Sequence, residues 1–243
     1  MRQASLDYFF NDDAQIVFRQ VCKRFPGGIR ALDDITLSIE QGEMVFLTGH
    51  SGAGKSSLLK LISLQQRVTR GQLRVSGRDL RKLPGRQIPA HRRKLGLVFQ
   101  DHQLLLNKSV FDNVALPLVI AGLGYREIGR RVRAALESVG LGEREKSMPG
   151  MLSAGQQQRV GIARAIVNKP DILLADEPTG NLDPQLSQNI MMLFRSFNER
   201  GMTVIIASHD LYLVRKLAQR VLVLQEGQLI DDIEPQHVIS GTP

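Results

Sequence analysis

The sequence predicts an α/β domain built on a largely parallel sheet. A glycine-rich loop of the form G-x-x-x-x-G-K-S lies at residues 49–56, between an apolar run and a segment with helical periodicity. In the second half of the chain, short apolar runs alternate with helix-like segments, which favours parallel strands covered by helices on both faces. The length of 243 residues and a hydrophobic content of 42% suit one domain with a sizeable core.

The N-terminal elements precede and follow this loop. Apolar or alternating residues predict strands at 16–18 and 35–39, and a Gln41-Gly42 turn follows the second strand. Residues 44–47 form a continuous apolar run that leads directly into the glycine loop. Leucine and isoleucine at 58, 59, 61 and 62 then fit a helix packed on the sheet, and 97–99 predicts a further strand.

A helical lobe interrupts the α/β pattern. Ile128, Val132, Leu136 and Val139 recur at helical spacing, and we expect a lobe over 101–159. The α/β alternation then resumes with strands at 172–175, 203–207 and 221–224 and helices at 154–167, 184–198 and 211–218. We therefore predict a single domain in which 14–100 and 160–232 form the α/β core, 101–159 the helical subdomain and 233–243 a tail.

Composition excludes several classes of protein. No segment approaches the ~20 apolar residues of a membrane span, since the best candidate, 114–123, is short and contains Pro117. The N-terminus lacks a signal-peptide pattern, and the single cysteine, Cys22, allows no internal disulfide. These features predict a soluble, cytosolic protein.

The net charge of +8 is concentrated in one stretch. Residues 67–94 contain ten Lys or Arg and one acid, Asp79. The favoured interpretation is a solvated basic face, followed by attraction to an anionic membrane surface or a partner. Nucleic acid comes last, because this stretch has no aromatic residue that could stack on bases.

The glycine loop predicts a phosphate site. Glycines at 49, 52 and 54 allow backbone N–H groups to point inward at a helix N-terminus. Lys55 supplies a positive charge to the β- and γ-phosphates, and the Ser56 hydroxyl is placed to ligate Mg²⁺. Ser57 comes next in the helix, where its side chain should point elsewhere. The expected binding segment is Gly49, His50, Ser51, Gly52, Ala53, Gly54, Lys55, Ser56 and Ser57.

Two acids end the strand at 172–175. Asp176 should lie beside the loop and hold Mg²⁺ directly or through water, whereas Glu177 points to the other side and can act on a water that attacks the γ-phosphate. Ordinary surface charge is the alternative. The upstream phosphate loop favours the catalytic interpretation, and so does Pro178, which ends the strand directly after the two acids.

Polar residues after two other strands are expected at the same edge of the sheet. His209 follows the strand at 203–207 and can donate to the γ-phosphate. Gln100 follows the strand at 97–99 and can contact both Mg²⁺ and the attacking water. The predicted catalytic residues are Lys55, Gln100, Glu177 and His209.

The expected base is adenine. Phe25 stands in a Pro-Gly-Gly loop, where its ring could stack on adenine, with core packing as the alternative. Residues 168–171 match the guanine-reading pattern N-K-x-D, but they precede a strand instead of following one. ATP is therefore preferred to GTP.

The segment Leu152-Ser153-Ala154-Gly155-Gln156 narrows the class of protein. It is similar to the signature peptide of ABC-type ATPases, and with the phosphate loop and the 172–177 segment it extends the resemblance over nearly the whole chain. The chain resembles an ABC transporter ATP-binding subunit. That resemblance implies a P-loop NTPase fold with a RecA-like parallel-sheet core, an antiparallel β subdomain and an inserted helical subdomain. Ala154 departs from the pattern, which has glycine there; the methyl group could slow hydrolysis but favours the helix by ~1 kcal/mol.

The resemblance also implies that two copies act together. Ser153 is expected to cap the helix that follows it, and in the family the same helix end points at the γ-phosphate bound to a second subunit. Asp183 lies in a segment, 180–183, that is similar to the family's D-loop. ATP binding would then close a homodimer head to tail, with Ser153, Gly155, Gln156 and Asp183 contributed across the interface.

Several segments resemble the cell-division ATPases of this family more than its other branches: 46–56, 100–105, 113–118 and 157–165. This implies an integral membrane partner and a peripheral location on the cytoplasmic face of the membrane, at the division site. The apolar residues 104–106, Val110 and Phe111 could contact that partner or belong to the core. The alternatives are an ATPase of lipoprotein release or macrolide export, a nucleic-acid-associated ATPase, and a scaffold without turnover.

Overall fold

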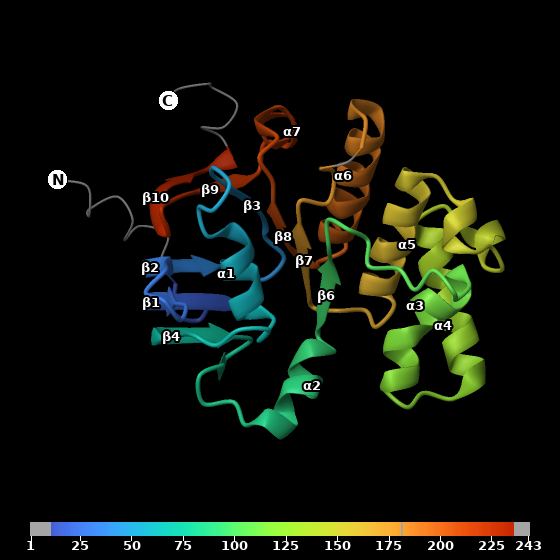
Figure 1. Cartoon of the computed structure of the whole chain (residues 1–243), viewed down its shortest axis with the longest axis horizontal. Coiled ribbons are helices and arrows are strands. Elements are labelled where there is room, and N and C mark those ends of the chain that lie inside the picture. Colours follow the sequence, from blue (N-terminus) through green and yellow to red (C-terminus); the bar gives the residue numbers. More distant parts are fainter. Residues whose placement is uncertain (1–10, 181, 236–243) are drawn as a thin grey trace.

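The computed structural model describes residues 11–180 and 182–235, which form two sheets and a set of covering helices (Figure 1). The first sheet is antiparallel, with the order β2-β1-β4-β5. Its strands are β1 (Ile16–Arg24), β2 (Arg30–Ile39), β4 (Arg70–Val75) and β5 (Arg78–Asp79).

The second sheet is the parallel one that the sequence predicts. Its order is β10-β9-β3-β8-β7-β6, and only the edge strand β10 runs antiparallel to its neighbour. Parallel strands end at the same edge, so the segments that follow β3, β6, β7 and β8 meet there. The strands are β3 (Met44–Thr48), β6 (Leu95–Val98), β7 (Ile172–Asp176), β8 (Thr203–Ala207), β9 (Arg220–Gln225) and β10 (Gln228–Ile233).

The helices surround these sheets, with α1 near the antiparallel sheet and α3 and α4 at the far side of α5 (Figure 1). They are α1 (Lys55–Ile62), α2 (Ile88–Arg92), α3 (Val110–Ile120), α4 (Tyr125–Ser138), α5 (Ala154–Ile166), α6 (Pro184–Asn198) and α7 (Leu211–Leu217). Short 3-10 turns occur at Gly85–Gln87, Gly142–Arg144 and Pro149–Met151.

The parallel core, the antiparallel sheet and the group of helices confirm the predicted fold class. The residue boundaries of the subdomains stay a prediction. Helix α5 runs without a break across positions 159 and 160, where the sequence analysis divides lobe from core. Most of the predicted tail, 236–243, lies outside the described residues.

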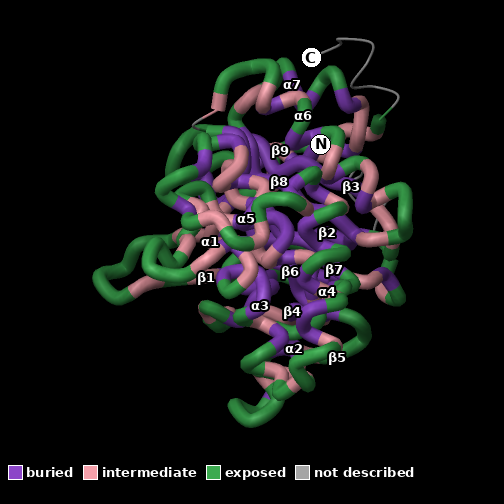
Figure 2. The backbone as a smooth tube through the Cα atoms, turned by 90° about the vertical axis from the view of Figure 1, so that its right-hand side faces the viewer, coloured by how far each residue is buried: buried purple, intermediate pink, exposed green. Residues whose placement is uncertain are grey.

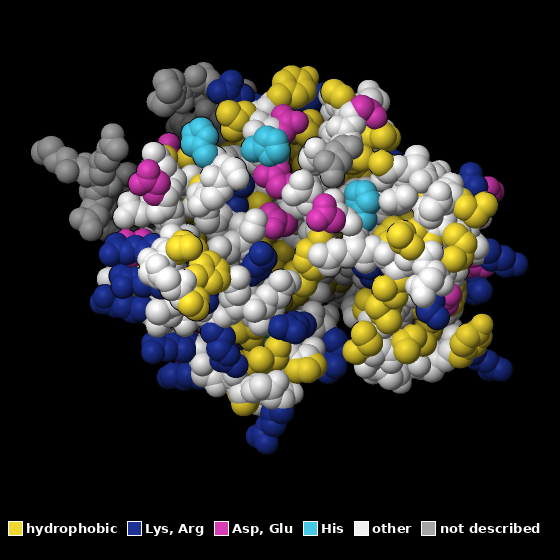
Figure 3. Space-filling view, viewed as in Figure 1, with side chains coloured by type: hydrophobic (Ala, Val, Ile, Leu, Met, Phe, Trp, Pro, Cys, Tyr) yellow, Lys and Arg dark blue, Asp and Glu magenta, His cyan; other side chains and the backbone are white. Residues whose placement is uncertain are grey.

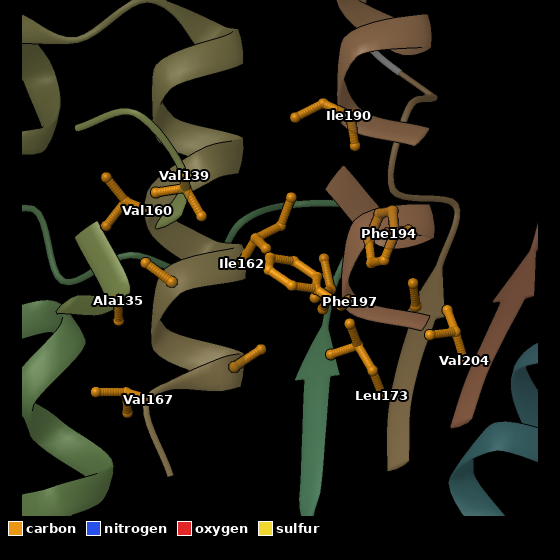
Figure 4. Packing of buried hydrophobic residues seen from close by; sticks show 14 of the residues in the cluster. Ala135, Val139, Val160, Ile162, Val167, Leu173, Ile190, Phe194, Phe197 and Val204 are labelled. Atoms are coloured by element: carbon orange, nitrogen blue, oxygen red, sulfur yellow. The ribbon is translucent and has the colours of Figure 1, made fainter. Parts of the chain in front are cut away.

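Buried residues concentrate in the middle of the molecule, along the strands and the inner parts of the helices, and exposed residues lie mostly at its periphery (Figure 2). Ile162 of α5 lies beside Phe197 of α6 and near Leu173 of β7, whereas Val160 and Val167 project from the other side of α5 (Figure 4). Helix α5 is therefore packed between the helical lobe and the parallel sheet.

A buried arginine joins elements of both sheets. Arg220 of β9 donates from Nε and Nη2 to Asp232 Oδ1 and Oδ2 of β10 at 2.7 and 2.6 Å. Its Nη1 donates to Glu43 Oε1 at 2.9 Å and to the carbonyl oxygen of Ser38 in β2 at 3.0 Å. Burial by itself disfavours the charged form, but the hydrogen bonds that Arg220 donates to Asp232 and the charges of Asp232 and Glu43 outweigh it and raise the pKa of Arg220.

The cations of the basic stretch are mostly exposed. Arg81, Lys82, Arg86 and Arg93 all face solvent. Lysine and arginine side chains gather beside the antiparallel sheet and below it (Figure 3). Within the described part of the chain, no helix is both long and apolar enough to cross a membrane.

Candidate nucleotide-binding site

The loop between β3 and α1 can be built only with glycine at two positions. Gly49 has φ 139°, and a Cβ there would collide with the carbonyl oxygen of Leu224 in β9. Gly54 has φ 110°, and its Cβ would lie 2.7 Å from the carbonyl oxygen of Ala31. Because L-residues rarely adopt such φ values, the glycines allow the backbone to pass this close to its neighbours.

Two backbone hydrogen bonds connect the loop to the antiparallel sheet. The amide of Gly227 donates to the Ala53 carbonyl at 3.1 Å, and the amide of Asp33 donates to the Gly227 carbonyl at 2.8 Å. Gly227 has φ 79°, and a Cβ there would lie 2.9 Å from the Ala31 carbonyl oxygen. The turn between β9 and β10 therefore ties the loop to β2.

Lys55 gives the loop its positive charge. The side chain is 8% exposed, and Nζ donates to the carbonyl oxygens of Gly49 at 2.7 Å and His50 at 3.1 Å. The N-terminus of α1 has no side-chain cap and no acidic residue in its first turn. A helix end without a cap, with a buried ammonium beside it, fits the phosphates of a nucleotide.

Ser56 and Asp176 meet at the edge of the sheet. The Ser56 hydroxyl donates to Asp176 Oδ1 at 2.9 Å, although the two residues are 120 positions apart. The contact follows from the strand order, because only β8 separates the end of β3 from the end of β7. Hydroxyl and carboxylate oxygens are the ligands that Mg²⁺ prefers, so this pair fits a magnesium ion.

Glu177 is held in an unusual backbone conformation. Its φ is 48°, which is uncommon for a residue other than glycine. Its amide donates to the Ala207 carbonyl of β8 at 2.9 Å, and its carbonyl accepts from the amide of Gly180 at 3.2 Å. Glu177 Oε2 lies 2.8 Å from His209 Nδ1. Neighbouring elements thus fix both the backbone and the carboxylate.

One cavity of about 850 Å³ brings most of the predicted residues together. The whole segment 49–57 lines it, Ser57 included, together with Gln100, Asp176, Glu177 and His209. Histidine and acidic side chains gather on the upper middle of the face shown in Figure 3. A phosphate loop, two acids, an amide and an imidazole therefore face a shared space.

Sequence reasoning missed part of this lining. The end of β9 lies beside the loop because β9 pairs with β3. The apolar run at 221–224 predicts the strand, but nothing in it indicates β3 as its neighbour. The missed residues are Ala31, Thr48, Leu211, Val223, Leu224, Gln225 and Ile230.

Phe25 is the first predicted site residue that lies outside this lining. It is half-buried in a turn where its amide donates to the Ile29 carbonyl at 2.9 Å. The Lys23 ammonium lies 4.9 Å from the centre of its ring. Stacking of Phe25 on adenine stays a prediction.

The signature residues also lie outside the lining. Ser153 is exposed and caps α5: its Oγ accepts from the amide of Gln156 at 3.3 Å, and Gln156 Oε1 accepts from the amide of Ser153 at 3.1 Å. A Cβ on Gly155 would lie 3.0 Å from Leu186 Cδ1. Asp183 caps α6 by accepting from the amide of Leu186 at 2.9 Å, and Asn181 lies outside the described residues. The expected contact of these residues with a second copy stays a prediction.

Comparison with known proteins agrees with this geometry. The family model "ABC transporter" matches residues 32–180. The cell division ATP-binding protein FtsE of Escherichia coli K12 is 53% identical over 214 residues, which cover 88% of this chain and 96% of that protein. FtsE of Mycobacterium tuberculosis is 47% identical, with 89% and 95% of the two chains covered.

Solved structures share the fold. CbiO1 of Clostridium perfringens, part of the ABC transporter complex CbiONQ, superposes with a TM-score of 0.87 at 31% identity, covering 95% of this chain and 92% of its own. The ATP-binding cassette MJ0796, solved as a dimer in a post-hydrolysis state with ADP and Pi, superposes with a TM-score of 0.83 at 33% identity. The match covers 90% of this chain and 98% of that one. The chain belongs to the ABC transporter family and is an ATP-binding, ATP-hydrolysing protein.

Proposed function

We propose that this chain is the ATPase subunit of an FtsEX-like membrane complex that serves cell division. Closure of two copies over ATP would act on an integral membrane partner of the FtsX type, and through it on cell-wall hydrolases. The observation that carries this proposal is the cavity that brings the phosphate loop, Asp176, Glu177 and His209 together, in a chain 53% identical to an FtsE protein.

The residues of the cavity receive distinct roles. The loop amides and Lys55 bind the phosphates, and Ser56, Asp176 and Gln100 would hold Mg²⁺. Bound Mg²⁺ neutralises charge that develops on the phosphate oxygens. Glu177 accepts a proton from the attacking water. His209, whose Nδ1 lies 2.8 Å from that carboxylate, orients the water and donates to the γ-phosphate.

Removal of the Lys55 ammonium tests the phosphate site. We expect Lys55→Ala to weaken ATP binding by ~10²-fold, because charge-assisted hydrogen bonds contribute about 1.5–3 kcal/mol each. Binding of a fluorescent ATP analogue measures the effect. Lys60→Ala, an exposed lysine on the same helix, is the control. Equal affinities of the two variants would contradict the assigned role.

The second copy completes the site in this proposal. Ser153, Gly155, Gln156 and Asp183 do not line the cavity of their own chain and lie at the N-terminal ends of α5 and α6, where Ser153 and Asp183 are exposed and Gly155 is buried. Such a position suits contacts across a head-to-tail homodimer. The dimeric cassette MJ0796 supports this arrangement.

An exposed apolar segment supports the proposal that a membrane protein binds this chain. Leu105 and Leu106 are 42% and 69% exposed, directly after the Gln100 turn. Asn113 fixes the backbone there, because its Oδ1 accepts from the Leu105 amide at 2.8 Å and its Nδ2 donates to the Leu105 carbonyl at 3.0 Å. Val110, in contrast, is fully buried, and Leu104 and Phe111 are partly buried and pack against the core. A pinned backbone with exposed leucines suits a docking site on the cytoplasmic face of the membrane.

Capture of the partner tests the proposed function. The chain is used as bait on detergent-solubilised membranes, with and without ATP, and an FtsX-type protein is expected among the captured proteins. Leu105→Glu should abolish capture without changing ATP binding, whereas Met192→Glu, at an exposed methionine of α6, should change neither. Loss of ATP binding in Leu105→Glu would show a core role instead. Capture of an exporter or lipoprotein-release permease would assign the chain to export or lipoprotein release instead of cell division. Salt-sensitive binding of DNA would favour a nucleic-acid-associated ATPase.

A further inference from the structure

Helix α5 lies between the two halves of the molecule and carries Ser153 at its tip. Its apolar side chains pack toward the helical lobe on one side and toward α6 and β7 on the other (Figure 4). Two of its polar side chains, Gln158 and Arg164, make hydrogen bonds to loops outside the helix. Each reaches a loop that carries a residue of the cavity.

Arg164 holds the turn after Gln100. Its Nη1 donates to the carbonyl oxygen of Gln103 and its Nη2 to that of His102, both at 2.7 Å. His102 and Gln103 have φ values of 51° and 47°, so the carbonyls are presented by two successive left-handed residues. The amide of His102 donates to the Phe99 carbonyl at 3.3 Å, which closes the turn around Gln100.

The guanidinium makes these bonds at a cost. No carboxylate of the described residues forms an ion pair with Arg164, and burial lowers its pKa below the usual value. A partly buried cation without a counter-ion is retained only where its hydrogen bonds offset the lost hydration. For Arg164 those bonds are the two to the turn that follows Gln100.

Gln158 holds the loop after Glu177. Its side chain is fully buried, and Nε2 donates to the Pro178 carbonyl at 2.7 Å. Its Oε1 has no partner among the described residues, so the amide is placed for this one bond. Pro178 directly follows Glu177, whose backbone lies in the left-handed region.

The two loops also lie close to each other. A Cβ built on Gly180 would lie 3.5 Å from Gln100 Nε2 and 3.6 Å from the carbonyl oxygen of Glu177. Both loops are therefore hydrogen-bonded to α5 and lie close to each other. A rigid displacement of α5 would move them together.

We propose that Arg164 and Gln158 are positioning residues through which α5 sets the Gln100 and Glu177 loops, so that the Ser153 tip and the two loops respond as one unit. This inference rests on the proposed function, in which the tip engages a second copy. Engagement at one site would thereby place the water-orienting groups of the other site. The coupling passes through hydrogen bonds to backbone carbonyls and needs no side-chain contact with the nucleotide.

The kinetic signature of Arg164→Ala tests the proposal. Misplacement of Gln100 should lower kcat ~10- to 100-fold, because small displacements of positioning groups are costly. The KM for ATP should change by no more than about twofold, because the phosphate loop is untouched. Arg159→Ala is the matched control: this arginine is also on α5 and also donates to a carbonyl, that of Val139 at 2.8 Å, but away from the cavity.

Two further variants keep the test decisive. Arg164→Lys retains the charge but loses the planar fork that meets the two carbonyls with separate nitrogens, so an intermediate kcat is expected. Gln158→Leu keeps the volume and removes the bond to Pro178, and it should also lower kcat at constant KM. A kcat of Arg164→Ala equal to that of Arg159→Ala, or a fall in melting temperature with unchanged kcat and KM, would overturn the inference. Should Arg164→Ala not fold, a wild-type kcat for Arg164→Lys would overturn it.

The wild-type chain separates this inference from the proposed function. Absence of ATP hydrolysis by the wild type, alone and with its membrane partner, would contradict the proposed function. Normal hydrolysis with unaffected Arg164 and Gln158 variants would leave that function standing and remove only the positioning role.

Discussion

Replacement of Glu177 by glutamine is expected to lower ATP turnover ~10²- to 10⁴-fold while ATP binding is kept, because an amide cannot accept the proton of the attacking water. The substitution keeps the size of the side chain, and its remaining oxygen can still meet His209 Nδ1, now 2.8 Å from Glu177 Oε2. Phosphate release measures turnover, and binding of a fluorescent ATP analogue measures affinity.

The chain offers a close control for this variant. Glu226 has φ 49°, nearly the value of Glu177, but it is exposed in the turn between β9 and β10 and does not line the cavity. Glu226→Gln should hydrolyse ATP at the wild-type rate. Turnover that survives in Glu177→Gln would remove the general-base role and favour a scaffold without a catalytic carboxylate.

The same variant reports on the homodimer. With hydrolysis blocked, saturating Mg-ATP should hold two copies closed, and light scattering should record the mass of a dimer. Monomers alone, with no membrane partner able to pair them, would contradict the roles proposed for Ser153, Gly155, Gln156 and Asp183.

Replacement of Arg220 by methionine is expected to destabilise the chain by about 3–5 kcal/mol, because it leaves the buried Asp232 carboxylate and the partly buried Glu43 carboxylate without their cation. Arg220 is 7% exposed and the Asp232 side chain 8%, so water cannot replace the lost bonds. For a chain of this size the corresponding fall in melting temperature is roughly 6–20 °C. Thermal and denaturant unfolding measure the change.

An exposed arginine provides the comparison. Arg195 pairs with Glu199 at 3.1 Å on the surface of α6, with side-chain exposures of 47% and 63%. Arg195→Met should cost about 0–1 kcal/mol. If both variants lost the same stability, burial of the Arg220 network would not be the cause.

Much of the fold was predictable because its signals are local. The apolar run of β3, the glycines that follow it and the periodicity of α1 occur within 20 residues of one another. Ser153 and Gln156 likewise form the predicted cap within one turn of α5. Residues that follow parallel strands could be assigned to one edge without knowledge of the strand order.

Other elements lack a local signal. Strand β4 buries only Leu73 and Val75, and the edge strand β10 (QLIDDI) has no fully buried residue, so neither shows the long apolar run that predicts a strand. Strand β6 covers Leu95–Val98 instead of 97–99, because Gly96 lies where β6 packs closely against α5 and β7. The position of Phe25 depends on the packing of β1 and β2, which periodicity does not encode.

The turn at Gly227 has a consequence for how the molecule can move. The Gly227 amide donates to the Ala53 carbonyl, and the Gly227 carbonyl accepts from the Asp33 amide. There is no room for a side chain at this glycine. These bonds connect the phosphate loop rigidly to β2 and its antiparallel sheet. Changes of shape during the ATPase cycle should therefore be concentrated on the opposite flank, in α3, α4 and α5.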